Sequence, residues 1–115
     1  MPSLKPTFRE IGSVTIVDLS GELVLGQSGA LRVALGQLMD NRRTKIILNL
    51  ANVKAIDSSG IGELVRTSTM LRRLGGQMKL VNPSERVREL LEITRLSTVF
   101  DTEPDEVTAI ASLAK

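Results

Sequence analysis

Four adjacent residues, Asp57-Ser58-Ser59-Gly60, carry the side chains in this sequence that are best placed to do chemistry. They stand between a predicted strand and a predicted helix, so they form a strand-to-helix turn. The first amides of a helix have no partner within it, and the helix dipole favours negative charge there. A hydroxyl at this point can cap the helix, and a phosphate can be held by the free amides. Gly60 and Gly62 lack side chains, so another protein could approach this helix end closely.

A purely structural explanation of the same turn is the commoner one for a short motif of this kind. Ser and Asp are preferred residues at the N-cap of a helix, so the turn could simply begin one. No capping box completes it, because Ile61 lies three residues after Ser58, and Gly62 lies three residues after Ser59. One serine is enough for a cap. The second serine is therefore unexplained by capping alone.

The composition argues against an enzyme. The chain contains no His and no Cys, which removes the usual general base, the commonest metal ligand and any disulfide or thiolate zinc site. The run Gly60-Ile61-Gly62 begins like a dinucleotide fingerprint, but Val65 stands where the third Gly or Ala is required. The long glycine-rich loop and Lys of a P-loop are missing, as is the Gly two residues before Ser58 that a nucleophile elbow needs. We expect no catalytic residue, no metal and no cofactor.

The charge pattern favours a solvated helix face over a nucleic-acid-binding patch. The net charge is only +2, and acidic and basic residues alternate, as in the run Glu85-Arg86-Val87-Arg88-Glu89. With two Phe and no Tyr or Trp, there is no aromatic platform for stacking bases. Glu103, Asp105 and Glu106 could suggest a cation site, but the negatively charged first turn of a helix explains them better. The sequence shows neither a signal peptide nor a membrane span, so we expect a cytoplasmic protein.

Short runs rich in apolar and β-branched residues predict the strands. The five expected strands are residues 8–11, 14–19, 46–50, 78–81 and 99–100. The first two are joined by the two-residue turn Gly12-Ser13 and are expected to form an antiparallel hairpin. Residues 21–26 are bounded by glycines and are expected to form a loop or a short extended stretch.

Between and after these strands, apolar residues at helical spacing predict four helices. Their expected inward-facing residues are Leu31, Ala34, Leu35, Leu38 and Met39; Ile61, Leu64, Val65, Ser68 and Leu71; Val87, Leu90, Leu91 and Thr94; and Val107, Ile110, Ala111 and Ala114. The second helix is expected to start at Ser59 or Gly60 and to stop at Gly75-Gly76. Asn82-Pro83-Ser84 opens the third helix, and residues 101–104 open the last.

The resulting order, β-β-α-β-α-β-α-β-α, predicts one α/β domain over residues 1–115. Right-handed crossovers between the strands give a mixed, mainly parallel sheet of about five strands with about four helices. In open sheets of this kind, functional sites gather at the carboxyl ends of the strands. Residues 57–62 lie at such an end, just past the third strand.

Several short motifs then appear in a fixed order along nearly the whole chain. They are Leu19-Ser20-Gly21-Glu22-Leu23, Ile47-Leu48-Asn49-Leu50, Ile56-Asp57-Ser58-Ser59-Gly60-Ile61-Gly62, Gly75-Gly76, Leu80-Val81 and Arg95-Leu96. In this order and spacing the chain resembles the STAS family, and within it the stand-alone anti-sigma factor antagonists of bacteria. It departs from the family at Val24, where an Asp often follows Gly-Glu-Leu.

The resemblance implies a phosphorylation switch. Ser58 would be the residue phosphorylated by an anti-sigma factor that is itself a serine kinase. Asp57, Ser59, Gly60, Ile61 and Gly62 would form the partner-binding surface around it. The unphosphorylated chain would bind the kinase and release a sigma factor, and a PPM-type serine phosphatase would reset the modified form. ATP and magnesium would belong to the kinase. The alternative is a scaffold or transporter-associated STAS domain, in which the turn only docks a permanent partner.

Overall fold

The computed structural model describes residues 4–27, 29–96 and 100–114, and the elements follow the predicted order. The strands are β1 (Lys5–Ile11), β2 (Val14–Leu23), β3 (Lys45–Ile56), β4 (Gln77–Val81) and β5 (Asp101–Glu103). The helices are α1 (Gly29–Asp40), α2 (Ser58–Arg73), α3 (Glu85–Ile93) and α4 (Glu106–Leu113). The predicted α/β fold is confirmed.

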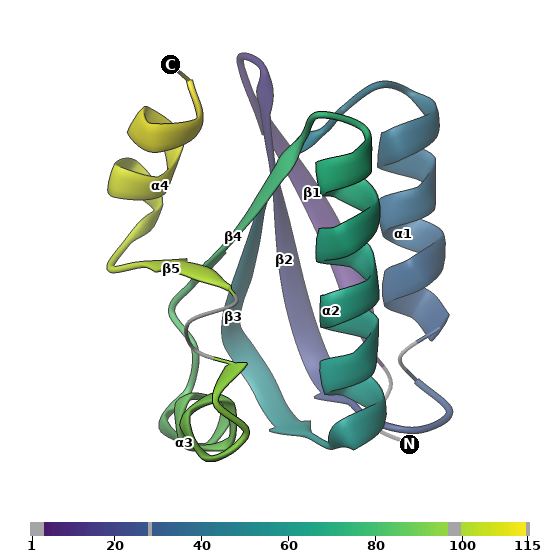
Figure 1. Cartoon of the computed structure of the whole chain (residues 1–115), viewed down its shortest axis with the longest axis vertical. Helices are drawn as coiled ribbons and strands as arrows, with labels where there is room; N and C mark the ends of the chain where they lie inside the picture. The colour runs from purple at the N-terminus through teal and green to yellow at the C-terminus, as the bar shows by residue number, and fades with distance from the viewer. Residues whose placement is uncertain (1–3, 28, 97–99, 115) are drawn as a thin grey trace.

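The five strands form a single sheet in the order β1-β2-β3-β4-β5 (Figure 1). The β1–β2 pair is antiparallel and closes at the turn Gly12-Ser13, where Ile11 pairs with Val14. All other neighbouring strands are parallel. The sheet is therefore mixed and mainly parallel, as the sequence predicts, because each later strand returns through a helical crossover.

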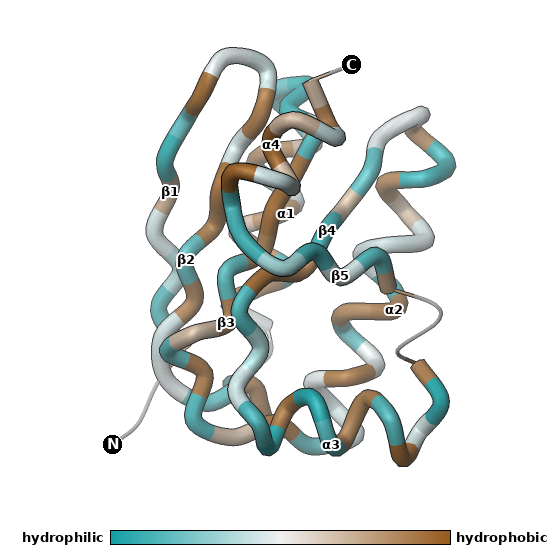
Figure 2. Tube along the Cα trace, turned by 90° about the vertical axis from the view of Figure 1, so that its left-hand side faces the viewer, coloured by the Kyte–Doolittle hydropathy of each residue, from teal (hydrophilic) through white to brown (hydrophobic). Residues whose placement is uncertain are grey.

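Helices cover both faces of the sheet. α1 and α2 lie side by side on one face, and α4 lies on the other (Figure 1). The larger core cluster joins α1 and α2 to the sheet through side chains such as Leu35, Leu64 and Leu48. The smaller cluster contains Ala109 and Leu113 from α4. α3 lies at one end of the molecule, and hydrophobic and hydrophilic residues alternate along it (Figure 2).

β2 and β3 extend well past their expected ends. β3 continues from residue 50 to Ile56, and β2 continues to Leu23, into the segment 21–26 that was expected to be a loop or a short extended stretch. The two extensions pair with each other, from Ser20 with Asn52 to Leu23 with Ile56, with shifts in register on the way. Since neither extension has a strong strand pattern, the pairing between distant segments decides their conformation.

The last predicted strand is displaced. Residue 99 lies outside the described residues, and Phe100, the other half of the prediction, is not in a strand but is buried. The strand begins at Asp101, where Lys79 of β4 is its partner. Residues 101–103, which were expected to open the last helix, thus pair with β4 in the sheet.

The inward face of α4 also differs from the prediction. Ala109 and Leu113 are buried, whereas Val107 is 78% exposed and Ala111 and Ala114 are exposed. Glu106, the first residue of α4, is turned toward the sheet, because Arg9 binds its carboxylate at 2.6 Å. Residues three, four and seven positions later then lie on the same side of the helix. The ion pair with β1 and the buried Ala109 and Leu113 thus lie on one side of α4.

Candidate functional site

The predicted turn is capped by Asp57, and neither serine is the cap. Asp57 has extended backbone angles, with φ −123° and ψ −173°, and its Oδ1 accepts a hydrogen bond from the N–H of Gly60 at 3.1 Å. α2 consequently starts at Ser58, slightly earlier than the sequence predicts. Asp57 satisfies one of the partnerless amides of the first turn.

Asp57 also fixes the position of a second segment. Its Oδ2 accepts a hydrogen bond from the N–H of Leu25 at 3.1 Å, and its own N–H donates to the carbonyl oxygen of Leu23 at 3.4 Å. The N–H groups of Leu25 and then Gly60 lower the pKa of the Asp57 carboxyl group below its usual value. Asp57 is therefore a charged, doubly bonded anchor, and it is poorly suited to accept a proton as a general base.

Ser58 is exposed at the first position of α2, and its hydroxyl makes no hydrogen bond with any of the residues that the structure describes. Ser59 is half-buried. The two adjacent serines therefore differ in environment. Because Asp57 performs the capping, the outward hydroxyl of Ser58 has no structural task in this turn.

The two glycines of the turn have different roles. A Cβ atom on Gly60 would lie 2.0 Å from the carbonyl oxygen of Leu23, which is far inside contact distance. Gly60 is buried, so packing against β2 within the chain requires it, and the sequence-based explanation of open access to the backbone is wrong for this residue. Gly62 is exposed, and a Cβ atom there would meet nothing within 4 Å. Open access therefore describes Gly62 alone.

The structure brings all the predicted site residues onto one helical turn, but it divides them between two sides. Ser58 and Gly62 face outward, whereas Ile61 is 7% exposed and belongs to the larger core cluster. The sequence analysis did not single out Leu25 as part of the site. Its side chain is 81% exposed, and its backbone is bonded to Asp57. The available sequence signal was an apolar residue within the segment 21–26, which is bounded by glycines.

The acidic residues near the C-terminus have separate tasks. Lys79 donates to Glu103 at 3.0 Å, Asp105 caps α4 by accepting from the N–H of Thr108 at 2.8 Å, and Glu106 binds Arg9. Within the described parts of the chain, no group of three or more acidic residues could hold a metal ion. Nor is any described helix long and apolar enough to cross a bilayer.

Comparison with known proteins agrees with this architecture. Residues 5–109 match the STAS domain model. The chain is 31% identical over 101 residues to a protein of Paenibacillus polymyxa named anti-sigma F factor antagonist, and the alignment covers 87% of this chain and 86% of that protein. The chain therefore belongs to the STAS domain family, among its anti-sigma factor antagonists.

Solved structures share the fold. An anti-sigma factor antagonist from Mycobacterium paratuberculosis superposes with a TM-score of 0.87 at 21% identity, covering 98% of this chain and 96% of that one. The Bacillus cell fate determinant SpoIIAA in its phosphorylated form superposes with a TM-score of 0.69 at 22% identity, covering 90% and 96%. At these identities the likeness concerns the fold.

Proposed function

We propose that this chain is an anti-sigma factor antagonist switched by phosphorylation at Ser58. The unphosphorylated form binds an anti-sigma factor that is a serine kinase, and so releases the sigma factor. The observation that carries the proposal is the exposed Ser58 hydroxyl at the mouth of α2, beside an aspartate that already caps the helix. A solved structure of a phosphorylated member of the same fold supports it.

The surface that meets the kinase is built around this hydroxyl. Ser59 and Gly62 lie on the same turn as Ser58 and provide contact surface. Gly60 and Ile61 are buried, so they contribute by holding the turn against the core. Asp57 contributes by fixing the start of α2 and the loop that carries Leu25.

Phosphorylation acts on binding and leaves the fold intact. It adds about −1.5 to −2 charges at Ser58. Within the domain, the helix dipole and the first amides of α2 favour that charge. In a close protein contact, the same charge loses water without gaining a partner, and Asp57 already places a negative charge next to it. ATP and magnesium belong to the kinase, and a PPM-type serine phosphatase restores the binding form.

The proposal is tested by binding and by location of the phosphate. The protein is incubated with ATP and the anti-sigma kinases of its host, and mass spectrometry locates the modification. We expect one phosphate, on Ser58. Ser58→Asp should weaken kinase binding by about 100-fold, because like-charge contacts cost several kcal/mol. Ser58→Ala should bind but gain no phosphate, and Ser59→Ala, the matched control, should be phosphorylated as the parent is.

Two results would contradict the switch. One is that Ser58→Asp and Ser58→Ala both bind as the parent does. The other is a stable complex that gains no phosphate from ATP, which would point to a scaffold or transporter-associated domain that uses the turn only for docking.

A further inference from the structure

Among the described residues, the last part of β3 has a neighbouring strand on one side only. β4 pairs with β3 from Lys45 with Gln77 to Asn49 with Val81, and the pairing stops there. β2 continues alongside β3 as far as Ile56. We call residues 51–56 the β3 overhang. Figure 1 shows this end of β3 running past β4 toward the start of α2.

The first residue of the overhang has its backbone donor satisfied, whereas the residues after it have no described strand beside them on the side away from β2. The N–H of Ala51 donates to Oδ1 of Asn49 at 3.0 Å, so its backbone donor is already satisfied. Residues 52–56 pair with β2 alone among the described strands. Since backbone groups alternate in direction along a strand, some of theirs point away from β2. Five extended residues offer an edge of about 17 Å.

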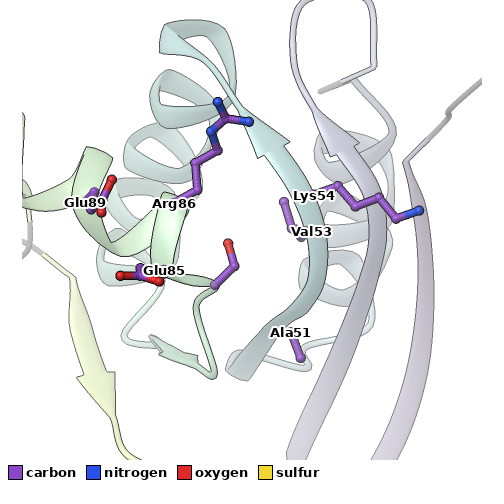
Figure 3. Close-up of a pocket in the computed structure, with 7 residues that line it drawn as sticks. Ala51, Val53, Lys54, Glu85, Arg86 and Glu89 are labelled. Carbon is purple, nitrogen blue, oxygen red and sulfur yellow. The ribbon is translucent and has the colours of Figure 1, made fainter.

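A groove runs along this open edge between the overhang and α3. It consists of two hollows, of about 540 and 320 Å³, which share Arg86 and Glu89 of α3 as lining residues. The strand side is lined by residues that include Val53 and Ile56. Figure 3 shows the overhang and α3 facing each other across the larger hollow. The smaller hollow extends the groove to Ile56, two residues before Ser58.

Apolar and charged side chains line the groove together. The smaller hollow, at Ile56, includes Leu90 and Ile93, the latter 77% exposed, and also Arg86 and Glu89. Arg86 lines both hollows, its side chain projects from α3 (Figure 3), and it forms no ion pair with any described residue. Glu85 lies on the side of α3 away from the strand in this view. The lining as a whole also includes Lys54, Glu85 and Glu89, so its charges are mixed in sign. Arg86 is the cation that both hollows share, unpaired among the described residues, and an acidic side chain of an occupant could pair with it.

We infer that the groove binds an extended segment of the anti-sigma factor, which adds to the sheet as a strand along the β3 overhang. An unpaired strand edge is a ready template for such addition. The segment carries an apolar side chain that packs on Ile56 and Ile93, and an acidic side chain that pairs with Arg86. The inference rests on the proposed function, because the groove reaches the Ser58 turn and one partner can cover both.

Amide hydrogen exchange tests the added strand directly. Exchange at residues 52–56 is measured in the unphosphorylated protein, alone and with its cognate anti-sigma kinase. The amides of this segment that do not bond to β2 should exchange rapidly in the free protein and at least about 10-fold more slowly in the complex. Those bonded to β2 are the internal reference, and their exchange should change less.

Matched variants test the side-chain contacts. Ile93→Gln should raise the Kd for the kinase about 10- to 100-fold, the range expected from leaving a large aliphatic side chain unburied. Val107→Gln, at an equally exposed position on α4 and outside the groove, should bind as the parent does. Arg86→Glu should also weaken binding, whereas Arg88→Glu, exposed on the same helix but not in the groove, should not. Circular dichroism confirms that each variant folds.

The outcomes separate this inference from the proposed function. Binding that depends on Ser58, with no protection of residues 52–56 and with Ile93→Gln binding as the parent does, overturns the added strand and leaves the switch in place. Absence of any binding to the kinase overturns both. Protection that appears in the protein alone and grows with its concentration identifies a second copy of the chain as the occupant, and it also overturns the inference.

Discussion

The carboxylate of Asp57 accepts a hydrogen bond from the backbone N–H of Leu25, and 3.1 Å separates Oδ2 from the nitrogen. The two residues are 32 positions apart in the chain. This bond ties the start of α2 to the loop between β2 and α1, so the exposed Leu25 side chain belongs to the same surface as Ser58. The other carboxylate oxygen caps α2 through Gly60. One side chain thus organises two segments of the candidate site.

Replacing Asp57 with Asn should destabilise the protein at neutral pH. The two backbone bonds are accepted by different carboxylate oxygens, and Asn carries an NH2 donor in place of one of them. The folded protein lowers the pKa of Asp57. Its stabilising effect is therefore fully present above the pKa of the unfolded state, near 4, and is lost as the pH falls through the lower pKa of the folded state. Urea unfolding of the parent and of Asp57→Asn should therefore differ at pH 7 and converge at strongly acidic pH. A difference that stays constant with pH would contradict this role.

Gly60→Ala should destabilise the protein by roughly 1–3 kcal/mol, because its Cβ would overlap the backbone of Leu23. Gly62→Ala is the matched control on the same turn. It has open space and an exposed helical position, so it should be neutral or stabilising by up to about 1 kcal/mol. Chemical denaturation measures both. Equal effects of the two substitutions would show that the contact with Leu23 is not what requires a glycine.

The charge introduced by Ser58→Asp should leave the fold intact. A negative charge in the first turn of a helix is favourable by about 0.3–1 kcal/mol. We therefore expect a melting temperature within about 4 °C of the parent value. Thermal unfolding followed by circular dichroism provides the measurement. A large fall in melting temperature would mean that loss of kinase binding reflects unfolding, and it would remove the basis for a local switch.

The orientation of α4 can be tested with two truncations. Leu113→Ala removes a side chain that is 2% exposed and should cost about 2–5 kcal/mol. Val107→Ala removes one that is largely exposed and should change stability by no more than about 0.5 kcal/mol. Urea unfolding of the two variants gives the comparison. A larger loss of stability in Val107→Ala than in Leu113→Ala would show that α4 faces the sheet with the side that the sequence pattern predicts.

Patterns with a strong local cause were predictable from the sequence. The two-residue turn at Gly12-Ser13, the inward stripe of α1 and the helix stop before Gly75 follow from backbone freedom and helical spacing. The position of Ser58 at the start of a helix was also predictable, because Asp, Ser and Gly cluster after an apolar run. These features depend on residues close together in the chain.

Other features depend on contacts between distant residues, and only the tertiary structure decided them. β3 extends to Ile56 because β2 pairs with it, and α4 turns toward the sheet the side that carries Ala109, Leu113 and the Glu106–Arg9 ion pair. For the Asp57–Ser58 pair, by contrast, the sequence alone determined that both residues stand at a helix start. Which of them caps the helix was set by packing, because Leu25 and Gly60 must both donate to one carboxylate. That geometry leaves the Ser58 hydroxyl facing outward.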